Sequence, residues 1–239
     1  MTLRGKDEIR DLVWTRMERE RVARFPGTRG RIPNFVGAER AALHLGSLPI
    51  WKKARVVKVS PDAPQLAVRR MALREGKVVY VAVPRLREKA CFIKLDPAVL
   101  GRDPTRGASI KGADRLGRPV TLDEIGPVDL IVCGAVAVNL RGARVGKGGG
   151  YSDLEYALLT ARGAVSPSVP ILTTVHPSQI LHEPIEMRVH DIPVDWIITP
   201  EGASRVAVDC PRPKGIVWEL LAMEKIEAIP VLKALRGDR

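Results

Sequence analysis

Apolar positions recur with two different periods along the chain, and this pattern predicts helices that alternate with strands. Helical spacing of apolar residues predicts a first helix within residues 6–24, followed by an irregular basic loop. The same spacing predicts further helices at residues 37–45, 64–75, 153–162 and 218–226. Short β-branched or apolar runs predict strands at residues 55–59, 77–83, 129–138, 169–175, 196–199 and 205–208. This order of elements favours an α/β fold with a mainly parallel sheet.

The run at residues 129–138 (DLIVCGAVAV) is nearly continuously apolar. A strand that is covered on both faces has this composition, as in the middle of a parallel sheet. No stretch rich in Pro, Gly or Ser divides the chain convincingly, and no fixed-period repeat is present. We therefore expect one domain over residues 1–239.

The segment at residues 139–153 (NLRGARVGKGGGYSD) follows this apolar run and precedes a predicted helix. Its glycines let backbone amides approach a phosphate closely, and the helix N-terminus adds oriented N–H groups. Two basic side chains add full positive charges. The candidate phosphate cradle consists of Arg144, Gly146, Lys147, Gly148, Gly149 and Gly150. Its spacing matches neither the P-loop nor the GxGxxG motif.

Four charged residues near this segment or at the N-terminus have an ordinary structural explanation on spacing alone. Asp153, at the start of a predicted helix, fits either a helix cap or a magnesium ligand that bridges phosphates. Lys6 and Arg10 are one helical turn apart, as on a solvated helix face. Asp191 fits a loop cap.

The charge balance favours an anionic partner. The chain has 39 Lys and Arg against 27 Asp and Glu, a net charge of +12. Such a surface attracts nucleic acid, nucleotide phosphates or polyglutamylated small molecules, although a basic surface without a specific partner fits equally well. Aromatic residues make up only 4% of the chain, so platforms for stacking single strands are scarce.

Cysteine usage and hydropathy bear on the compartment. The three cysteines, Cys91, Cys133 and Cys210, are widely separated, which excludes a disulfide scaffold and a cysteine zinc site. No apolar run approaches the roughly 20 residues that a membrane helix needs, and the N-terminus lacks a secretory signal. We expect no membrane association and a cytoplasmic location. The oligomeric state is not indicated.

The sequence RVGKGGGYSD, from Arg144 to Asp153, resembles the R-x-G-x-G-x-G-Y-Y-D signature of the 5-formyltetrahydrofolate cyclo-ligase family. Lys6 and Arg10 are similar to the family's N-terminal nucleotide-contacting pair. Residues 190–199 (HDIPVDWIIT) resemble a late segment of the family in which the first acid, here Asp191, is the second magnesium ligand.

Further segments resemble the subgroup called methenyltetrahydrofolate synthetase domain-containing proteins, whose larger animal members carry an RNA-recognition domain after this region. These segments are RIPNF (31–35), PRLR (84–87), GGGYSDLEYA (148–157) and CPRPKGIVW (210–218). The resemblance implies a Rossmann-like three-layer α/β/α fold with a mainly parallel sheet, similar to the NagB/RpiA/CoA-transferase type. Residues 206–239 would be the subgroup's C-terminal extension.

The resemblance implies an enzyme that uses ATP and Mg²⁺ to convert 5-formyltetrahydrofolate to 5,10-methenyltetrahydrofolate. The implied nucleotide-binding residues are Lys6, Arg10, Arg144, Gly146, Lys147, Gly148, Gly149, Gly150, Tyr151 and Ser152. Arg144, Lys147 and Tyr151 would be catalytic. Asp153 and Asp191 would hold magnesium, and Asp62 and Tyr151 would contact the folate-like substrate.

This chain departs from the family pattern at three positions. Ser152 and Leu154 replace a second tyrosine and a frequent basic residue, and Asp62 stands where a folate-binding glutamate is typical. Alternatives to the folate reaction are a nucleotide-dependent enzyme with another substrate, and a non-catalytic protein that binds RNA through its basic surface. A structural or partner-binding role is a third alternative.

Overall fold

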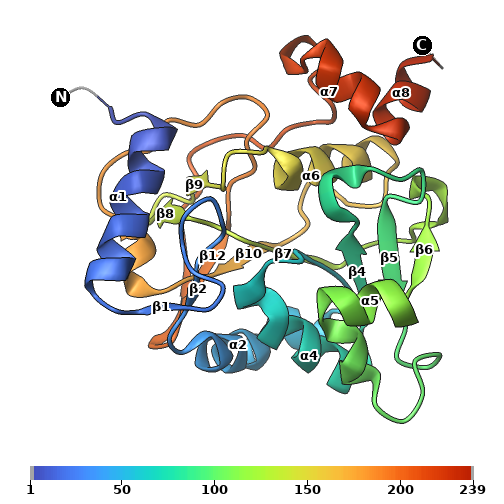
Figure 1. Ribbon diagram of the computed structural model, residues 1–239, viewed down its shortest axis with the longest axis horizontal. Helices are drawn as coiled ribbons and strands as arrows, with labels where there is room; N and C mark the ends of the chain where they lie inside the picture. Colours follow the sequence, from blue (N-terminus) through green and yellow to red (C-terminus); the bar gives the residue numbers. More distant parts are fainter. Residues whose placement is uncertain (1–2, 238–239) are drawn as a thin grey trace.

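The computed structural model describes residues 3–237 (Figure 1). Its helices are α1 (Lys6–Arg19), α2 (Ala38–Ser47), α3 (Pro49–Lys53), α4 (Leu66–Arg74), α5 (Ile110–Leu116), α6 (Tyr151–Ala161), α7 (Met223–Ala228) and α8 (Pro230–Gly237). The main sheet contains, in spatial order, β13 (Gly202–Arg205), β12 (Trp196–Thr199), β10 (Ile171–Thr174), β7 (Leu130–Cys133), β3 (Val56–Val59), β4 (Val78–Ala82), β5 (Phe92–Leu95) and β6 (Arg118–Val120). Two small sheets pair β1 (Ala23–Arg24) with β2 (Asn34–Phe35), and β8 (Ala137–Asn139) with β9 (Arg144–Val145) and β11 (Ile180–Leu181).

The five central strands of the main sheet run parallel, and antiparallel strands extend both edges. The parallel strands are β12, β10, β7, β3 and β4. From β3 the chain adds β4 on one side and later adds β7, β10 and β12 on the other side. The strand order therefore reverses between β3 and β7. Ligands of open α/β sheets bind outside the carboxyl ends of the strands at such a point.

Helices cover both faces of this sheet, which gives three layers. Figure 1 shows α2, α4 and α5 on one side of the sheet and α6, α7 and α8 on the other. One buried cluster unites Leu45 of α2 and Val68 of α4 with Val57 of β3, and a second unites Leu158 of α6 with Ile131 of β7. Successive residues of a strand point to opposite faces, so β3 contributes to both layers. The predicted three-layer α/β fold with a mainly parallel sheet is confirmed.

The apolar run at residues 129–138 is not one strand, as the sequence predicted, but two. It divides at Gly134 into β7 of the main sheet and β8 of a small sheet. A Cβ at Gly134 would lie 3.0 Å from Ile32 and 3.1 Å from Asp62, so the chain passes tightly between these residues. Both halves are buried, and an apolar run cannot distinguish one buried strand from two.

Other boundaries also differ from the prediction. The first helix ends at Arg19 rather than at residue 24, because Arg21 has a left-handed φ of 57° and residues 23–24 pair with β2. The strand expected at 205–208 lies at Gly202–Arg205 and is antiparallel to β12. The helix expected at 218–226 is a 3₁₀ turn, Trp218–Leu220, followed by α7. Helix α5 and strands β5 and β6 were not predicted.

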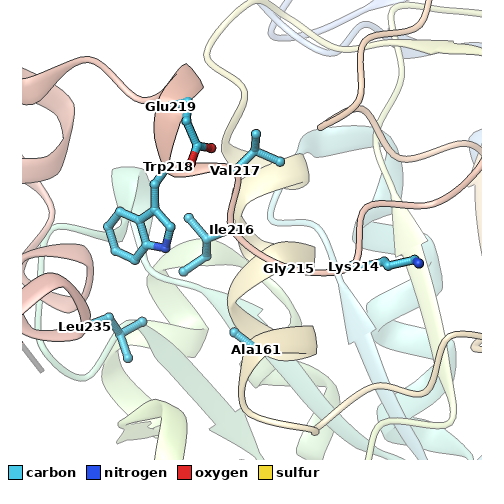
Figure 2. A pocket seen from close by; sticks show the side chains of 8 residues that line it. All are labelled: Ala161, Lys214, Gly215, Ile216, Val217, Trp218, Glu219 and Leu235. Carbon is cyan, nitrogen blue, oxygen red and sulfur yellow. The ribbon is translucent and has the colours of Figure 1, made fainter. Parts of the chain in front are cut away.

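The C-terminal segment packs on α6. Ile226, Ile229 and Leu232 are at most 3% exposed and join the same apolar cluster as α6. Figure 2 shows Trp218, Ile216 and Leu235 around a pocket beside Ala161 at the end of α6, with a volume of about 510 Å³. Each fully buried Leu or Ile contributes about 1.5–3 kcal/mol, so these contacts hold α7 in place. That residues 1–239 form one domain stays a prediction.

No helix among residues 3–237 combines the length and apolar character needed to cross a bilayer.

Candidate functional site

A cleft of about 840 Å³ opens at the point where the strand order reverses. Its walls come from the basic loop at 25–34, from residues 61–63 after β3, from the glycine segment 146–150 and from the start of α6. Tyr151 and Ser152, the first two residues of α6, line it too. The structure therefore brings most of the predicted site residues into a single cleft.

The glycine segment needs its glycines for conformational reasons at two positions. Gly148 and Gly150 have φ of 108° and 64°, which side chains rarely allow. Gly150 is the N-cap residue of α6, so the segment leads directly into the first turn of this helix. The N–H groups of a first helical turn lack partners within the helix and carry a partial positive charge. This arrangement suits an anion.

The N-terminal helix supplies two basic residues to the site. Arg10 donates from Nε to the carbonyl oxygen of Gly146 at 2.7 Å and is only 12% exposed. Lys6 forms an ion pair with the buried carboxylate of Asp191. These residues lie four positions apart and so share one face of α1. That face contacts the site residues, so the interpretation as a solvated helix face is wrong.

Arg144 and Asp153 form a buried ion pair behind the glycine segment. Arg144 lies in β9, and its Nη2 donates to Oδ1 of Asp153 at 2.5 Å. Burial, the largest single influence, raises the pKa of Asp153, but the charge of Arg144 and the hydrogen bonds from Ile192 and Arg144 together outweigh it and hold the pKa below its usual value. Burial, the largest single influence, lowers the pKa of Arg144, but the nearby acidic groups, with Asp153 foremost, and the hydrogen bond to Asp153 together raise it above its ordinary value. Both groups are therefore charged at neutral pH.

Asp153 is not a helix cap, so the first of its two interpretations is wrong. Gly150 occupies the N-cap position, and Asp153 is the third residue of α6. Besides Arg144, the carboxylate accepts a hydrogen bond from the backbone N–H of Ile192 at 3.0 Å. Both hydrogen bonds use Oδ1. Ile192 directly follows Asp191, so α6 and the late segment bring these two acids together.

The two acids match the donor chemistry of magnesium in part. Asp191 accepts hydrogen bonds from Lys6 and from the backbone N–H of Arg188. Residues 3–237 contain no group of three or more His, Cys, Asp or Glu that would form a complete metal site. Magnesium prefers oxygen ligands and usually keeps several waters beside one or two carboxylates and substrate phosphates. Asp153 and Asp191 fit that smaller role.

Asp62 faces the cleft rather than its neighbouring prolines. Its Oδ1 accepts a hydrogen bond from Nζ of Lys147 at 2.9 Å, and its side chain is 14% exposed. Lys147 thus joins the glycine segment to the residue predicted to bind substrate. Arg69 donates to the backbone oxygens of Ser60 and Asp62 and fixes the turn after β3. Burial lowers the pKa of Arg69 to about 10.

Two features of the site were missed by the sequence analysis. Lys58 of β3 and Glu155 of α6 form an ion pair beneath the cleft, and both side chains are at most 6% exposed. A lysine within the apolar run VVKV was the available signal. Lys225 of α7 contacts the glycine segment from the C-terminal side, with Nζ 2.9 Å from the carbonyl oxygen of Gly149. No sequence pattern marks Lys225.

Comparison with known proteins identifies the fold and the family. The sequence model of the 5-formyltetrahydrofolate cyclo-ligase family matches residues 3–200. The chain belongs to this family. The family takes its name from a ligase, which supports an enzymatic role for this member of it. The resemblance noted in the glycine segment is thus confirmed.

Curated relatives of this cyclo-ligase family member carry the subgroup's name. The methenyltetrahydrofolate synthase domain-containing protein of Bos taurus is 41% identical over 236 residues, 97% of this chain and 62% of the relative. The Homo sapiens protein of the same name is 40% identical over 237 residues, 98% of this chain and 62% of the relative. The chain spans about three fifths of the length of these relatives.

A solved cyclo-ligase relative supports the fold alone. The NMR structure of Aquifex aeolicus 5,10-methenyltetrahydrofolate synthetase superposes with a TM-score of 0.53 at 23% identity. The match covers 90% of this chain and 99% of that chain.

Proposed function

We propose that this chain is a 5-formyltetrahydrofolate cyclo-ligase that uses ATP and Mg²⁺ to form 5,10-methenyltetrahydrofolate. The observation that carries the proposal is that one cleft contains both the glycine segment and Asp62, which Lys147 connects by a hydrogen bond. Family membership supports the same reaction. The three cysteines, none of which forms a disulfide, support a cytoplasmic location for it.

In this proposal the glycine segment and the first turn of α6 bind the triphosphate. The amides of residues 146–150 donate to phosphate oxygens, and Arg10 and Lys147 neutralise their charge. Arg144 is buried and acts by holding Asp153 in place. Mg²⁺, when bound by Asp153 and Asp191, would offset further charge on the phosphates.

Lys147 lies between the two halves of the proposed site and positions the reacting groups. The formyl oxygen attacks the γ-phosphorus and the bond to ADP breaks. N10 then attacks the formyl carbon, and phosphate and the proton of N10 leave. Each step needs the γ-phosphate beside the formyl group, with water excluded. Lys147 is fixed by Asp62 on one side and by the glycine segment on the other, and Tyr151 lines the same cleft. Their proximity supports this alignment.

The decisive assay is the appearance of methenyltetrahydrofolate absorbance when purified protein is incubated with ATP, Mg²⁺ and 5-formyltetrahydrofolate. Failure of the protein to form this product while it still binds ATP would favour another substrate.

The folate half of the site is tested by Asp62→Asn. We expect the KM for 5-formyltetrahydrofolate to rise about tenfold, while the KM for ATP changes little. A carboxylate that loses its charge in a cleft also becomes a weaker acceptor for substrate N–H groups. Steady-state kinetics with each substrate varied in turn measure both constants. Asp123→Asn, at an exposed acid, is the matched control. Equal changes in both KM values would contradict a role for Asp62 in folate binding.

The net charge of +12 favours RNA binding as a second candidate function. It predicts an affinity for RNA that falls steeply as salt rises, because bound phosphates release counterions. Filter binding or fluorescence anisotropy at several salt concentrations between about 50 and 200 mM measures this dependence. Over this range the RNA affinity should fall by roughly 10³-fold or more. Asp153→Asn would leave this RNA affinity intact. A flat salt dependence would exclude the RNA-binding function.

A further inference from the structure

The glycine segment is held from two sides by residues at opposite ends of the chain. Arg10 of α1 donates to the carbonyl oxygen of Gly146, and Lys225 of α7 donates to that of Gly149. Lys225 lies beyond residue 200, where the match to the cyclo-ligase family ends. The contact between Lys225 and the glycine segment therefore comes from a part of the chain outside the family match.

Lys225 is placed closely against the start of α6. Its Nζ lies 5.1 Å from the centre of the Tyr151 ring, and a Cβ on Gly150 would be 3.4 Å from this nitrogen. An ammonium above an aromatic face is attracted to it. Three consecutive residues of the proposed phosphate site, Gly149, Gly150 and Tyr151, thus surround a single positive charge.

Packing of helix α7, in addition to the hydrogen bond of Lys225, fixes the position of this residue. The adjacent residue, Ile226, is 3% exposed and packs in the cluster that contains α6. Trp218 and Leu235, which precede and follow α7 in the chain, pack against the same cluster and line the pocket beside Ala161 in Figure 2. A lysine side chain that is already ordered loses less entropy when it binds a ligand.

We infer that Lys225 is a nucleotide-binding residue, which the C-terminal segment adds to the phosphate site of this chain. The inference rests on the proposed function for the presence of a nucleotide. The ligand class is a nucleoside triphosphate, because the segment that Lys225 contacts is the anion cradle. On binding, the ammonium donates to a phosphate oxygen and continues to hold the segment at Gly149.

The test compares Lys225→Met with Lys233→Met. Lys233 lies on α8 and pairs with exposed Glu227 at 2.7 Å, so it controls for loss of one charge in the same segment. We expect Lys225→Met to weaken Mg-ATP binding about tenfold in calorimetry, AMP binding much less, and Lys225→Arg to retain most of the ATP affinity. The KM for 5-formyltetrahydrofolate should not change. Lys233→Met should behave as the wild-type protein.

The outcomes separate this inference from the proposed function. Equal losses for ATP and AMP, or an unchanged ATP affinity in a folded Lys225→Met protein, would overturn the role of Lys225. Urea unfolding of both variants shows whether the fold is kept. Wild-type protein that binds ATP but forms no methenyl product would refute the folate reaction and leave the assignment of Lys225 standing. Absence of ATP binding in the wild-type protein would refute both.

Discussion

Asp153→Asn will reduce cyclo-ligase turnover by a factor on the order of 10²–10³, the loss typical when one preorganised electrostatic group is removed. The asparagine keeps an oxygen that can accept from Arg144 and from Ile192, so the local geometry can persist. It removes the negative charge that magnesium would need. Calorimetry with ATP and Mg²⁺ should show weakened binding, and the product assay should show the loss of turnover.

The same substitution leaves the buried guanidinium of Arg144 without a counter-charge, so its effect on stability must be measured separately. Urea unfolding and circular dichroism report whether the variant folds. Asp123→Asn, at a 70% exposed acid, is the control. A folded Asp153→Asn protein with wild-type affinity for Mg-ATP would remove Asp153 from the site.

The low pKa of Asp153 also fixes the sign of its pH dependence. Because the folded-state pKa lies below the unfolded value of about 3.9, its stabilising effect is present above that pH. The effect is lost only as the pH falls through the lower folded-state pKa. We therefore expect protonation of Asp153 not to limit activity between about pH 5 and pH 8.

The layered fold and the phosphate cradle could be predicted because local patterns determine them. The strand at 196–199 was located at its observed bounds, since a short β-branched run between turn residues has one interpretation. The glycine segment was located because positive φ and close approach leave a composition signal. Both features depend on residues that are neighbours in the sequence.

The features that the sequence analysis missed depend on contacts between distant segments. Strand β6 contains Pro119 and is exposed at two of its three positions, so it has no apolar alternation. The division at Gly134 is caused by its approach to Ile32 and Asp62. The position of Lys225 over Tyr151 is fixed by packing of residues far apart in the chain. Periodicity within one segment contains no information about such contacts.

Lys58→Met will lower the free energy of unfolding by about 3–5 kcal/mol, the cost of leaving one member of a buried pair without its partner. Lys58 is 2% exposed, and it lies on β3 between Ile131 of β7 and Tyr80 of β4. The substitution leaves the carboxylate of Glu155 in an apolar layer without a cation. Urea unfolding of the single variant measures the loss.

The double variant Lys58→Met with Glu155→Met separates the cost of an orphaned charge from the value of the pair. Nζ of Lys58 contacts Oε2 of Glu155, and the attraction between them must offset the cost of burying two charges. We expect the double variant to regain most of the stability, because apolar residues of similar volume often replace such pairs without loss. Lys233→Met, which breaks an exposed pair, should leave the unfolding midpoint unchanged. A double variant as unstable as the single one would show that the pair itself stabilises the fold.

Glu155 also lines the cleft, so the pair bears on the site as well as on stability. A stable double variant with altered kinetic constants would show that this buried pair helps to shape the cleft.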